Sequence, residues 1–203
     1  MTKRIILAAL AACLAASPVQ AQQAAPLTQA PKDDLVRVAI DTSAGRILIA
    51  LDRGRAPLSV ANFLAYIDGK KFDGESFYRA MPYGDGGLIQ GGIASDARKL
   101  RQPVAHESTS VTGLSNVAGA LVMAREAPGT ARADFFILTT DIKAFDATAA
   151  EPGFAVFGRV VEGMDVVKAI FAAPRSATKG AGIMKGQMLE PAVKILKATR
   201  LRP

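Results

Sequence analysis

The feature that most constrains the fold of this chain is a succession of short apolar segments separated by glycine and other turn residues. Val36, Val38 and Ile40 alternate with polar or small residues, which is the two-residue period of a half-buried strand. A turn at 42–45 leads into the apolar run 46–51, so these segments predict a β-hairpin. Further short strands are expected at 77–79, 88–90, 120–124, 135–139, 155–161 and 192–199.

Two stretches of the sequence have helical spacing instead. Val60, Phe63, Leu64 and Ile67 recur at intervals of three and four residues, which places them on one face of a helix. A second helix is expected within 163–174, a segment that ends in proline. Many short strands with two helices predict a mainly β fold, a closed antiparallel barrel plugged at its ends.

Side chains able to carry out acid–base, thiol or metal chemistry are scarce in this sequence. Among 203 residues there are one Cys and one His, which excludes an intrachain disulfide, a cysteine zinc site and a histidine-rich metal site. The single histidine, His106, is expected to be a surface or structural residue. The glycine-rich segment 84–92 lacks the Lys-Ser/Thr ending of a phosphate-binding loop. No cofactor and no metal site are therefore expected.

The net charge of +7 raises the question of nucleic-acid binding. The 25 Lys and Arg residues are scattered, however, and form no run of five. Aromatic residues, which would stack on the bases of a single strand, make up 6% of the chain and do not interleave with the basic ones. A diffuse positive surface that does not bind nucleic acid is the expectation.

Residues 1–21 have the pattern of a secretory signal peptide. Two basic residues precede the apolar stretch 5–16, and small residues close the segment as a cleavage site requires. The apolar stretch is shorter than the roughly 20 residues of a membrane span, so no span is expected. The polar segment 22–34 is expected to be a disordered leader before a single domain over 35–203. The sequence thus predicts an exported, periplasmic protein.

Cys13 leaves a second interpretation of the N-terminus open. The segment Leu10-Ala11-Ala12-Cys13 resembles a bacterial lipobox, in which the cysteine is lipidated and anchors the protein to a membrane. Few apolar residues precede this segment, and the better-formed cleavage site lies downstream, so soluble export is favoured. Cleavage after Ala21 would leave a mature chain without cysteine, which suits an oxidising compartment.

Five sequence blocks occur in a characteristic order along the chain. They are Phe-Tyr-Arg-Ala-Met-Pro at 77–82, Leu-Ile-Gln-Gly-Gly at 88–92, 119–125 with Met-Ala-Arg at its end, Asp-Phe-Phe-Ile at 134–137, and 154–164 beginning Phe-Ala-Val-Phe-Gly. With the helical segment 56–63, they resemble the cyclophilin family of peptidyl-prolyl cis-trans isomerases, particularly the exported bacterial type. The resemblance spans residues 36–199 and implies an eight-stranded antiparallel closed β-barrel capped by two α-helices. It also implies an isomerase of X–Pro bonds that acts on unfolded or partly folded polypeptides; a monomer is expected.

The resemblance implies that Arg79 is the catalytic residue. An X–Pro bond rotates across a barrier of about 18–20 kcal/mol, and a guanidinium can lower it by hydrogen-bonding the prolyl nitrogen as its lone pair localises. Gln90 would hold the substrate backbone and the arginine, and Ala124 lies where the family accepts substrate-backbone hydrogen bonds. The residues expected to form or border an apolar pocket for the proline ring are Met123, Phe136, Leu88, Phe145 and Phe154. Without the resemblance Phe136 would be interpreted as a core residue, and for Met123 the core stays an open alternative.

Several positions depart from the family pattern. Tyr78 stands where a His is usual, and a few extra residues separate Arg79 from Gln90. Gly87 replaces a pocket Phe, a loss that Leu88 would cover only in part. The other departures are Asp134 for a substrate-contacting Gln, Arg125-Glu126 for Asn-Ala, Ala144 before Phe145 for a Trp or Phe, and Phe154 for a His or Tyr.

The lost pocket wall has two expected consequences. Proline binding should weaken by roughly 1–2 kcal/mol, and cyclosporin binding should be weak. An alternative function also stays open, because an eroded pocket favours binding over turnover. The chain would then be a catalytically weak, proline-segment-binding or chaperone-like module on the same barrel.

Overall fold

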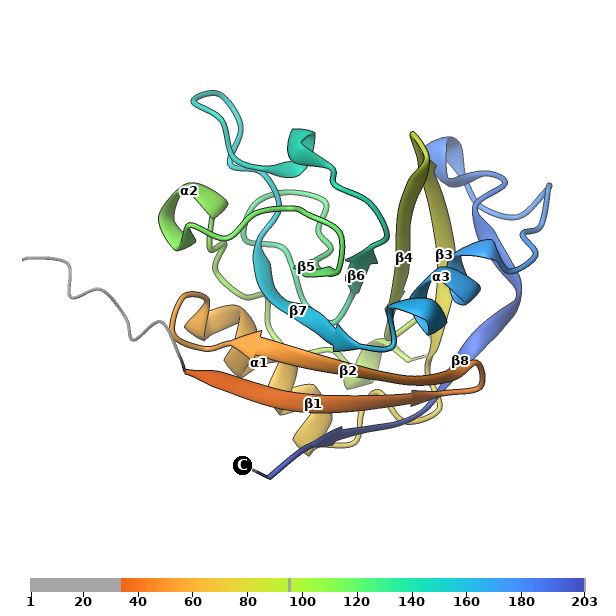
Figure 1. Ribbon diagram of the computed structural model, residues 1–203, viewed down its shortest axis with the longest axis horizontal. Coiled ribbons are helices and arrows are strands. Elements are labelled where there is room, and N and C mark those ends of the chain that lie inside the picture. The colour runs from red at the N-terminus through yellow and green to blue at the C-terminus, as the bar shows by residue number, and fades with distance from the viewer. Residues whose placement is uncertain (1–33, 95, 203) are drawn as a thin grey trace, which may run out of the picture.

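Eight antiparallel strands form a closed barrel in the computed structural model, which describes residues 34–94 and 96–202 (Figure 1). Around the barrel the strands follow the order β1-β2-β7-β5-β6-β4-β3-β8, and β8 closes it by pairing with β1. The expected barrel is therefore confirmed. The strands are β1 (Leu35–Thr42), β2 (Gly45–Asp52), β3 (Ser76–Tyr83), β4 (Gly86–Gly92), β5 (Ala120–Met123), β6 (Phe135–Leu138), β7 (Val156–Glu162) and β8 (Met188–Arg200).

The N-terminal predictions concern a part of the chain that the structure does not describe. The signal peptide expected at 1–21, Cys13 within it, and residues 22–33 of the expected leader all lie outside the described residues. Strand β1 begins at Leu35, directly after the first described residue, Asp34. The signal peptide, the leader and the lipid anchor thus stay predictions.

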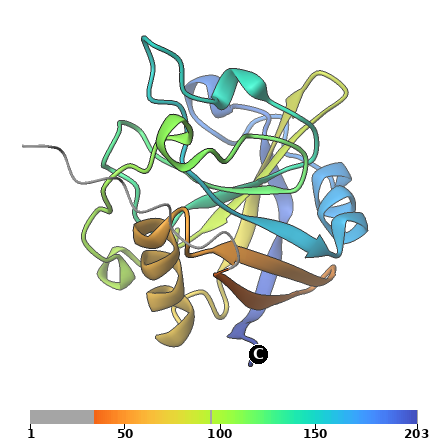
Figure 2. The ribbon, with the colours of Figure 1, turned by 60° about the vertical axis from the view of Figure 1, so that its left-hand side comes forward.

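Within the described residues three α-helices accompany the barrel: α1 (Pro57–Asp68), α2 (Thr109–Thr112) and α3 (Met164–Ala172). The two expected helices are α1, which packs on β2, β7 and β8, and α3, which packs on β2, β3 and β4. Figure 2 shows them at opposite sides of the barrel. The single turn α2 has too few residues to show a helical period in the sequence. None of the described helices has the length and hydropathy needed to cross a membrane.

A carboxylate from a distant loop completes the N-terminus of α1. Glu107 accepts hydrogen bonds from the backbone nitrogens of Leu58 at 3.0 Å and Ser59 at 2.8 Å, two donors that the helix itself leaves unpaired. His106 is hydrogen-bonded through Nε2 to the carbonyl of Pro152 at 3.0 Å. The pair 106–107 therefore fastens one loop to its surroundings, which fits the structural role expected of the histidine.

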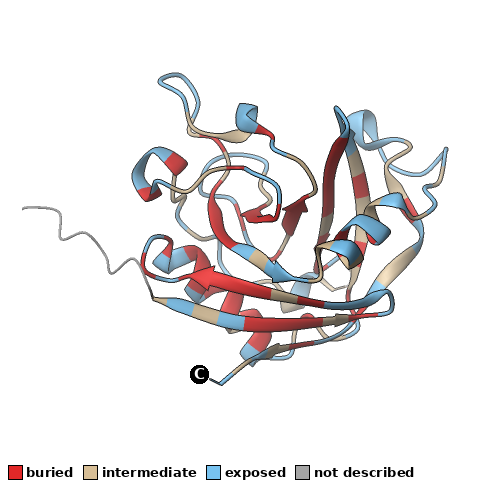
Figure 3. Ribbon diagram, in the orientation of Figure 1, coloured by how far each residue is buried: buried red, intermediate tan, exposed pale blue. Residues whose placement is uncertain are grey.

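Aromatic rings fill the interior of the barrel. We call Phe63, Phe72, Phe77, Phe135 and Phe157 the interior cluster; each is at most 1% exposed. The Phe135 ring meets the rings of Phe63 and Phe77 edge-on, at centroid distances of 5.1 and 5.7 Å. Strand β6 is buried along its whole length (Figure 3), and its successive side chains alternate between the two faces. Phe136 is therefore directed out of the barrel, where the candidate site lies.

Candidate active site

Two consecutive side chains of β3, Tyr78 and Arg79, lie together on the outer face of the barrel. The pairing of β3 shifts register between Phe77 and Arg79 against both of its neighbours, β4 and β8, which marks a β-bulge. Phe77 and Ala80 on either side are fully buried, whereas Tyr78 and Arg79 are half-buried. Because of the bulge, one strand presents a phenol and a guanidinium side by side.

Arg79 lies in one row with Gln90 and Phe136 across three neighbouring strands. Arg79 of β3 pairs with Gln90 of β4, and Gln90 pairs in turn with Phe136 of β6. Cross-strand partners share a face of the sheet, and neighbouring strands are about 4.8 Å apart. The row thus places a guanidinium and an aromatic ring on the two sides of one carboxamide.

Two glutamines hold the guanidinium of Arg79. Nη1 donates to Oε1 of Gln90 at 2.7 Å, and Nε donates to Oε1 of Gln187 at 2.8 Å. Gln187 is itself fixed, because its Nε2 donates to the carbonyl of Ile183 at 2.7 Å. Within the part of the chain that the structure describes, Nη2 of Arg79 makes no hydrogen bond. Burial lowers the pKa of Arg79, yet an arginine keeps its proton at such a site, so a charged donor is available.

Four of the expected pocket residues come together in a second apolar cluster, on the outer face of the barrel. We call Leu88, Phe136, Phe145 and Phe154 the outer cluster. The ring centroids of Phe136 lie 6.0 Å from Phe145 and 5.7 Å from Phe154, and the last two are 4.8 Å apart. Leu88 and Phe136 are buried at its base, whereas Phe145 and Phe154 are half-buried at its rim. Ala124, expected to meet the substrate backbone, packs against this cluster.

Met123 does not join the outer cluster, contrary to the sequence-based expectation. Its side chain is 2% exposed and belongs to the barrel core. In the pairing of β5 with β6, Met123 is the partner of Phe135, which points inward, and Val122 is the partner of Phe136, which points outward. Strand alternation therefore gives the pocket face to Val122 and keeps Met123 inside.

The backbone geometry at Gly87 explains why the pocket has no wall at this position. Its φ is 152°, and a Cβ at this position would lie 1.9 Å from the carbonyl oxygen of Met81 and 2.9 Å from the ring of Phe171 in α3. A side chain here would collide with the neighbouring strand and with α3. The glycine is thus required by the path of the β3–β4 hairpin, and no side chain at this position can form a wall of the pocket.

Two side chains of β3 that the sequence reasoning missed cover this end of the site. Met81 packs against the outer cluster, and the ring of Tyr83 lies 6.5 Å from that of Phe145. Tyr83 is 45% exposed, so it forms a rim rather than a base. The signal that could have found both is the two-residue period counted from Arg79, which puts positions 81 and 83 on the same face.

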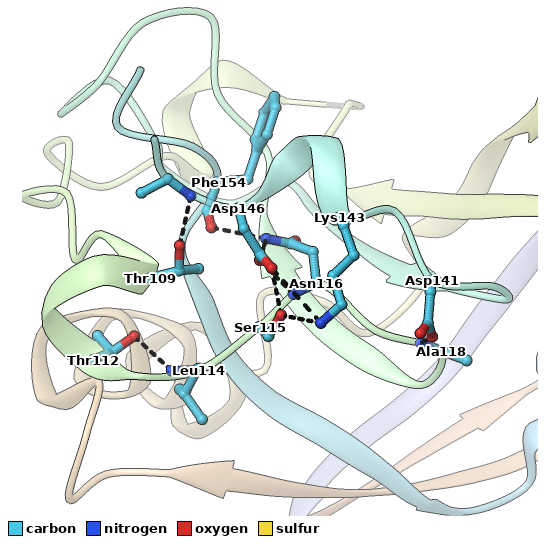
Figure 4. Close-up of polar contacts among 11 residues, drawn as sticks. Thr109, Thr112, Leu114, Ser115, Asn116, Ala118, Asp141, Lys143, Asp146 and Phe154 are labelled. Carbon is cyan, nitrogen blue, oxygen red and sulfur yellow. Dashed lines mark hydrogen bonds and ion pairs between the residues drawn. The ribbon is translucent and has the colours of Figure 1, made fainter. Parts of the chain in front are cut away.

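The two rim rings are carried by loop 143–154. The half-buried carboxylate of Asp146 fastens this loop to the segment that precedes β5 (Figure 4). Asp146 accepts hydrogen bonds from the hydroxyl of Ser115 and from the backbone nitrogen and Nδ2 of Asn116, the latter two at 2.7 and 2.8 Å. Burial opposes ionisation of this carboxyl, but the hydrogen bonds outweigh burial and lower the pKa of Asp146. The backbone nitrogen of Phe154 also donates to the carbonyl of Phe145 at 2.8 Å, which ties the two ring-bearing residues together.

The other departures from the family pattern surround the same rim. The guanidinium carbon of Arg125 lies 4.7 Å from the centroid of the Phe154 ring, and its Nη2 donates to the carbonyl of Gly153. This arginine therefore covers one side of the Phe154 ring. Ala144 is exposed and supplies no ring. The expected loss of an aromatic residue at that position is a real feature of the site.

Tyr78 and Asp134 adjoin the Arg79–Gln90 pair: Tyr78 contacts Gln90, and Asp134 neighbours Tyr78. Nε2 of Gln90 donates to the Tyr78 hydroxyl at 2.7 Å. Burial, together with the neighbouring carboxylate of Asp134, raises the pKa of Tyr78, so the phenol keeps its proton. Burial also raises the pKa of Asp134, although hydrogen bonds from Tyr78 and from the backbone of Ile93 act in the opposite direction.

The described residues form a closed β-barrel whose outer face carries an apolar cluster beside a fixed guanidinium. Over residues 34–94 and 96–202, no group of three or more His, Cys, Asp or Glu side chains is arranged to hold a metal ion. The fold and the site therefore define a class of barrel protein that can receive an apolar ring next to an arginine donor.

Comparison with known proteins places the chain within that class. The family described as cyclophilin type peptidyl-prolyl cis-trans isomerase/CLD matches residues 36–200. The chain is 39% identical over 137 residues to peptidyl-prolyl cis-trans isomerase A of Dickeya dadantii, which covers 66% of this chain and 70% of that protein. It is 36% identical over 143 residues to a peptidyl-prolyl cis-trans isomerase of Acinetobacter baylyi, which covers 68% and 73%.

A solved structure agrees at the level of the fold. The crystal structure of a cyclophilin type peptidyl-prolyl cis-trans isomerase of Cryptosporidium parvum superimposes with a TM-score of 0.68 at 19% identity, covering 83% of this chain and 99% of that one. The chain belongs to the cyclophilin-type peptidyl-prolyl cis-trans isomerase family. The resemblance seen in the sequence and the isomerase function inferred from it are thereby confirmed.

Proposed function

We propose that this protein accelerates the cis–trans isomerisation of X–Pro bonds in exported polypeptides, with Arg79 as the catalytic residue. The observation that carries the proposal is the row of Arg79, Gln90 and Phe136 across β3, β4 and β6. A proline ring seated on Phe136 would bring its own ring nitrogen toward the guanidinium. Proline-containing unfolded or partly folded chains are the substrates that this arrangement suits.

Binding of the proline ring would use the outer cluster. Leu88 and Phe136 provide an apolar base, and Phe145 and Phe154 stand around it as half-exposed rings. Apolar burial contributes about 25 cal/mol for each Å² removed from water, so a ring enclosed on several sides gains more than one on a flat surface. Gln90 and Ala124 lie beside the base, where they can hold the peptide backbone on either side of the proline.

Catalysis would depend on a hydrogen-bond donor that the substrate uses only when its X–Pro bond is twisted. In a planar peptide bond the prolyl nitrogen shares its lone pair with the carbonyl and is a poor acceptor. As the bond twists, the lone pair localises on nitrogen, and the Nη2 group of Arg79, which makes no hydrogen bond within the described chain, can donate to it. An interaction present in the transition state and absent from both planar states lowers the barrier.

The alternative of a proline-binding module without strong catalysis rested on the missing wall at position 87. Met81 and Tyr83 occupy that end of the site, which favours a working pocket. NMR exchange measurements on a proline peptide separate the two functions. Binding shifts with accelerated cis–trans exchange support the isomerase, whereas binding shifts without acceleration would select the chaperone-like module.

The decisive variant is Arg79→Ala. Removal of a single transition-state donor lowers kcat by about a hundredfold or more in other enzymes, and a loss of this size is expected here, with the midpoint of thermal unfolding almost unchanged. Arg98→Ala is the matched control, because that side chain is 91% exposed and pairs with Asp96 away from the site. If Arg79→Ala isomerised a proline peptide as fast as the unaltered protein, the proposed mechanism would be wrong.

Export to the periplasm is the cellular part of the proposal. Its support is the sequence of residues 1–21, which has the basic start, apolar stretch and small-residue end of a signal peptide. Mass spectrometry of the mature N-terminus tests it. A free N-terminus at Gln22 agrees with soluble export, whereas a lipidated Cys13 would show a membrane-anchored lipoprotein. The expected monomer is tested by the mass of the purified protein in solution.

A further inference from the structure

The hydrogen bonds around Arg79 have directions that the chemistry of the groups dictates. A guanidinium has donors only, so the Gln90 atom that faces Nη1 must be the carbonyl oxygen, Oε1. The amide nitrogen of Gln90 then faces Tyr78, and the phenol oxygen must accept from it, at 2.7 Å. If the carboxamide turned over, its NH₂ group would face the NH₂ group of the guanidinium, and the contact would become repulsive.

The proton of the Tyr78 hydroxyl therefore has to point away from Gln90. The carboxylate of Asp134 neighbours this hydroxyl and helps to raise the pKa of Tyr78, so it is a candidate acceptor for the phenol proton. Asp134 is only partly exposed, and within the described chain its Oδ1 has no hydrogen-bond partner. When ionised, a carboxylate can only accept, which would direct the phenol proton toward Asp134.

The opposite side of the guanidinium is oriented in the same manner. Gln187 turns its Oε1 to Nε of Arg79 because its Nε2 donates to the carbonyl of Ile183. The amide nitrogen of each glutamine thus points away from Arg79. The two sides differ in one respect, since Gln187 is oriented by a backbone carbonyl and Gln90 by the hydroxyl of a side chain, Tyr78.

We propose that Tyr78 is a positioning residue that keeps the carbonyl oxygen of Gln90 directed at Arg79. The β-bulge is what makes this possible, because it sets Tyr78 and Arg79 next to each other on the outer face, both within reach of one carboxamide. The terminal torsion of a glutamine is soft, so a lone Gln90 would turn over readily. The role of Tyr78 in catalysis rests on the proposed function of Arg79.

A double-mutant cycle tests this role. Tyr78→Phe removes the acceptor for Gln90 and should lower kcat by about fivefold to tenfold, the size of one hydrogen bond, with KM little changed. In a Gln90→Ala background the same substitution should change kcat by less than about twofold, because there is no carboxamide left to orient. An equal loss in both backgrounds would overturn the proposal. Tyr66→Phe is the matched control, since its hydroxyl accepts from the backbone of Arg101 within the core, away from the site.

NMR signals of the Arg79 guanidinium separate this proposal from the proposed function. In Tyr78→Phe the Nη–H signals of Arg79 should broaden or shift. Unchanged signals would overturn the positioning role whatever happens to activity. Altered signals with full kcat would instead overturn the catalytic role of Arg79.

Asp134 offers a second route if Tyr78→Phe fails to fold. Asp134→Asn retains an acceptor for the phenol and should keep kcat within about twofold, whereas Asp134→Ala should lose about as much as Tyr78→Phe. Equal kcat values for Asp134→Asn and Asp134→Ala would contradict the chain of orientation.

Discussion

The interior and outer clusters are built from the same kind of side chain but are held in different ways. Ring centroids that belong to the interior cluster lie 5.1 to 5.7 Å apart, and those of the outer cluster lie 4.8 to 6.0 Å apart. Phe135 and Phe136, adjacent on β6, belong one to each. The first cluster is fully buried among the barrel strands, helix α1 (which carries Phe63) and the turn that carries Phe72, whereas two of the three rings of the second sit on loop 143–154 and are half-buried.

The difference shows what an aromatic residue contributes in each setting. A ring enclosed by the barrel has all its contacts filled by the protein and contributes to the free energy of folding. A ring at the rim keeps contacts unfilled, and these are available to a ligand. Packing alone does not fix the position of such a ring. Here the polar contacts of Asp146 with Ser115 and Asn116 hold the loop that carries it. Four substitutions, in order of expected effect, test this contrast.

The adjacent pair on β6 gives the largest effect. Phe135→Ala should lower the free energy of unfolding by about 3–5 kcal/mol, because it opens a cavity in a fully enclosed cluster. Phe136→Ala should destabilise less and should reduce kcat/KM by about tenfold or more, since it removes the base of the proline site. Urea denaturation and a proline-peptide assay measure the two quantities. Equal destabilisation with unchanged kcat/KM in Phe136→Ala would remove the distinction between the clusters.

Asp146→Ala should have the next largest effect. It removes the acceptor of the half-buried Ser115 hydroxyl and of the backbone N–H of buried Asn116, which costs about 1–3 kcal/mol of stability, and it frees the loop that carries Phe145 and Phe154. KM should rise while Arg79 still supports turnover. Asp141→Ala, just before this loop, is the matched control, because Asp141 accepts one backbone hydrogen bond, from Ala118 at 2.8 Å. A KM equal to that of the unaltered protein would show that the rim does not depend on this carboxylate.

The same carboxylate predicts a pH dependence of stability. The pKa of Asp146 is lowered in the folded protein, so its contribution is fully present above the unfolded pKa of about 3.9. It is lost as the pH falls through the lower, folded pKa. The free energy of unfolding of the unaltered protein should therefore fall more steeply below about pH 4 than that of Asp146→Asn. Parallel curves would contradict the lowered pKa.

Tyr83→Ala should have the smallest effect. The ring is 45% exposed and contacts Phe145 from one side, so its loss should raise KM a few-fold, by about 0.5–1.5 kcal/mol, and leave unfolding almost unchanged. Tyr83→Phe keeps the ring and should keep KM. Leu196→Ala, at a 59% exposed position of β8, controls for loss of surface area. If both Tyr83→Ala and Tyr83→Phe gave the same KM as the unaltered protein, Tyr83 would not be part of the rim of the site.

Regular alternation is the part of this structure that the sequence predicts well. In β1 and β2, residues such as Val38, Ile40 and Ile49 are buried as their two-residue period requires. Gln90 and Phe136 follow from the resemblance, and strand pairing brings them into one row with Arg79. Local spacing and family pattern suffice where a side chain's neighbours lie on regular strands.

The parts that the sequence does not predict are those where the period breaks or where a partner is distant. A bulge puts Tyr78 and Arg79 on one face, which alternation alone would forbid. Gln187 reaches Arg79 from far along the chain, and no local pattern marks it. The sequence also leaves open whether Met123 faces the pocket or the core, because the phase of a four-residue strand is set by its partner β6.

The pairing of β8 with both β1 and β3 has a consequence for synthesis. The strand that closes the barrel is also the last one of the fold to be made, and its partners wait with unpaired edges until it arrives. Contacts between such distant segments form slowly, since long loops must close first. A nascent chain whose final strand is still inside the ribosome therefore exposes two sheet edges, and only release of that strand removes both of them at once.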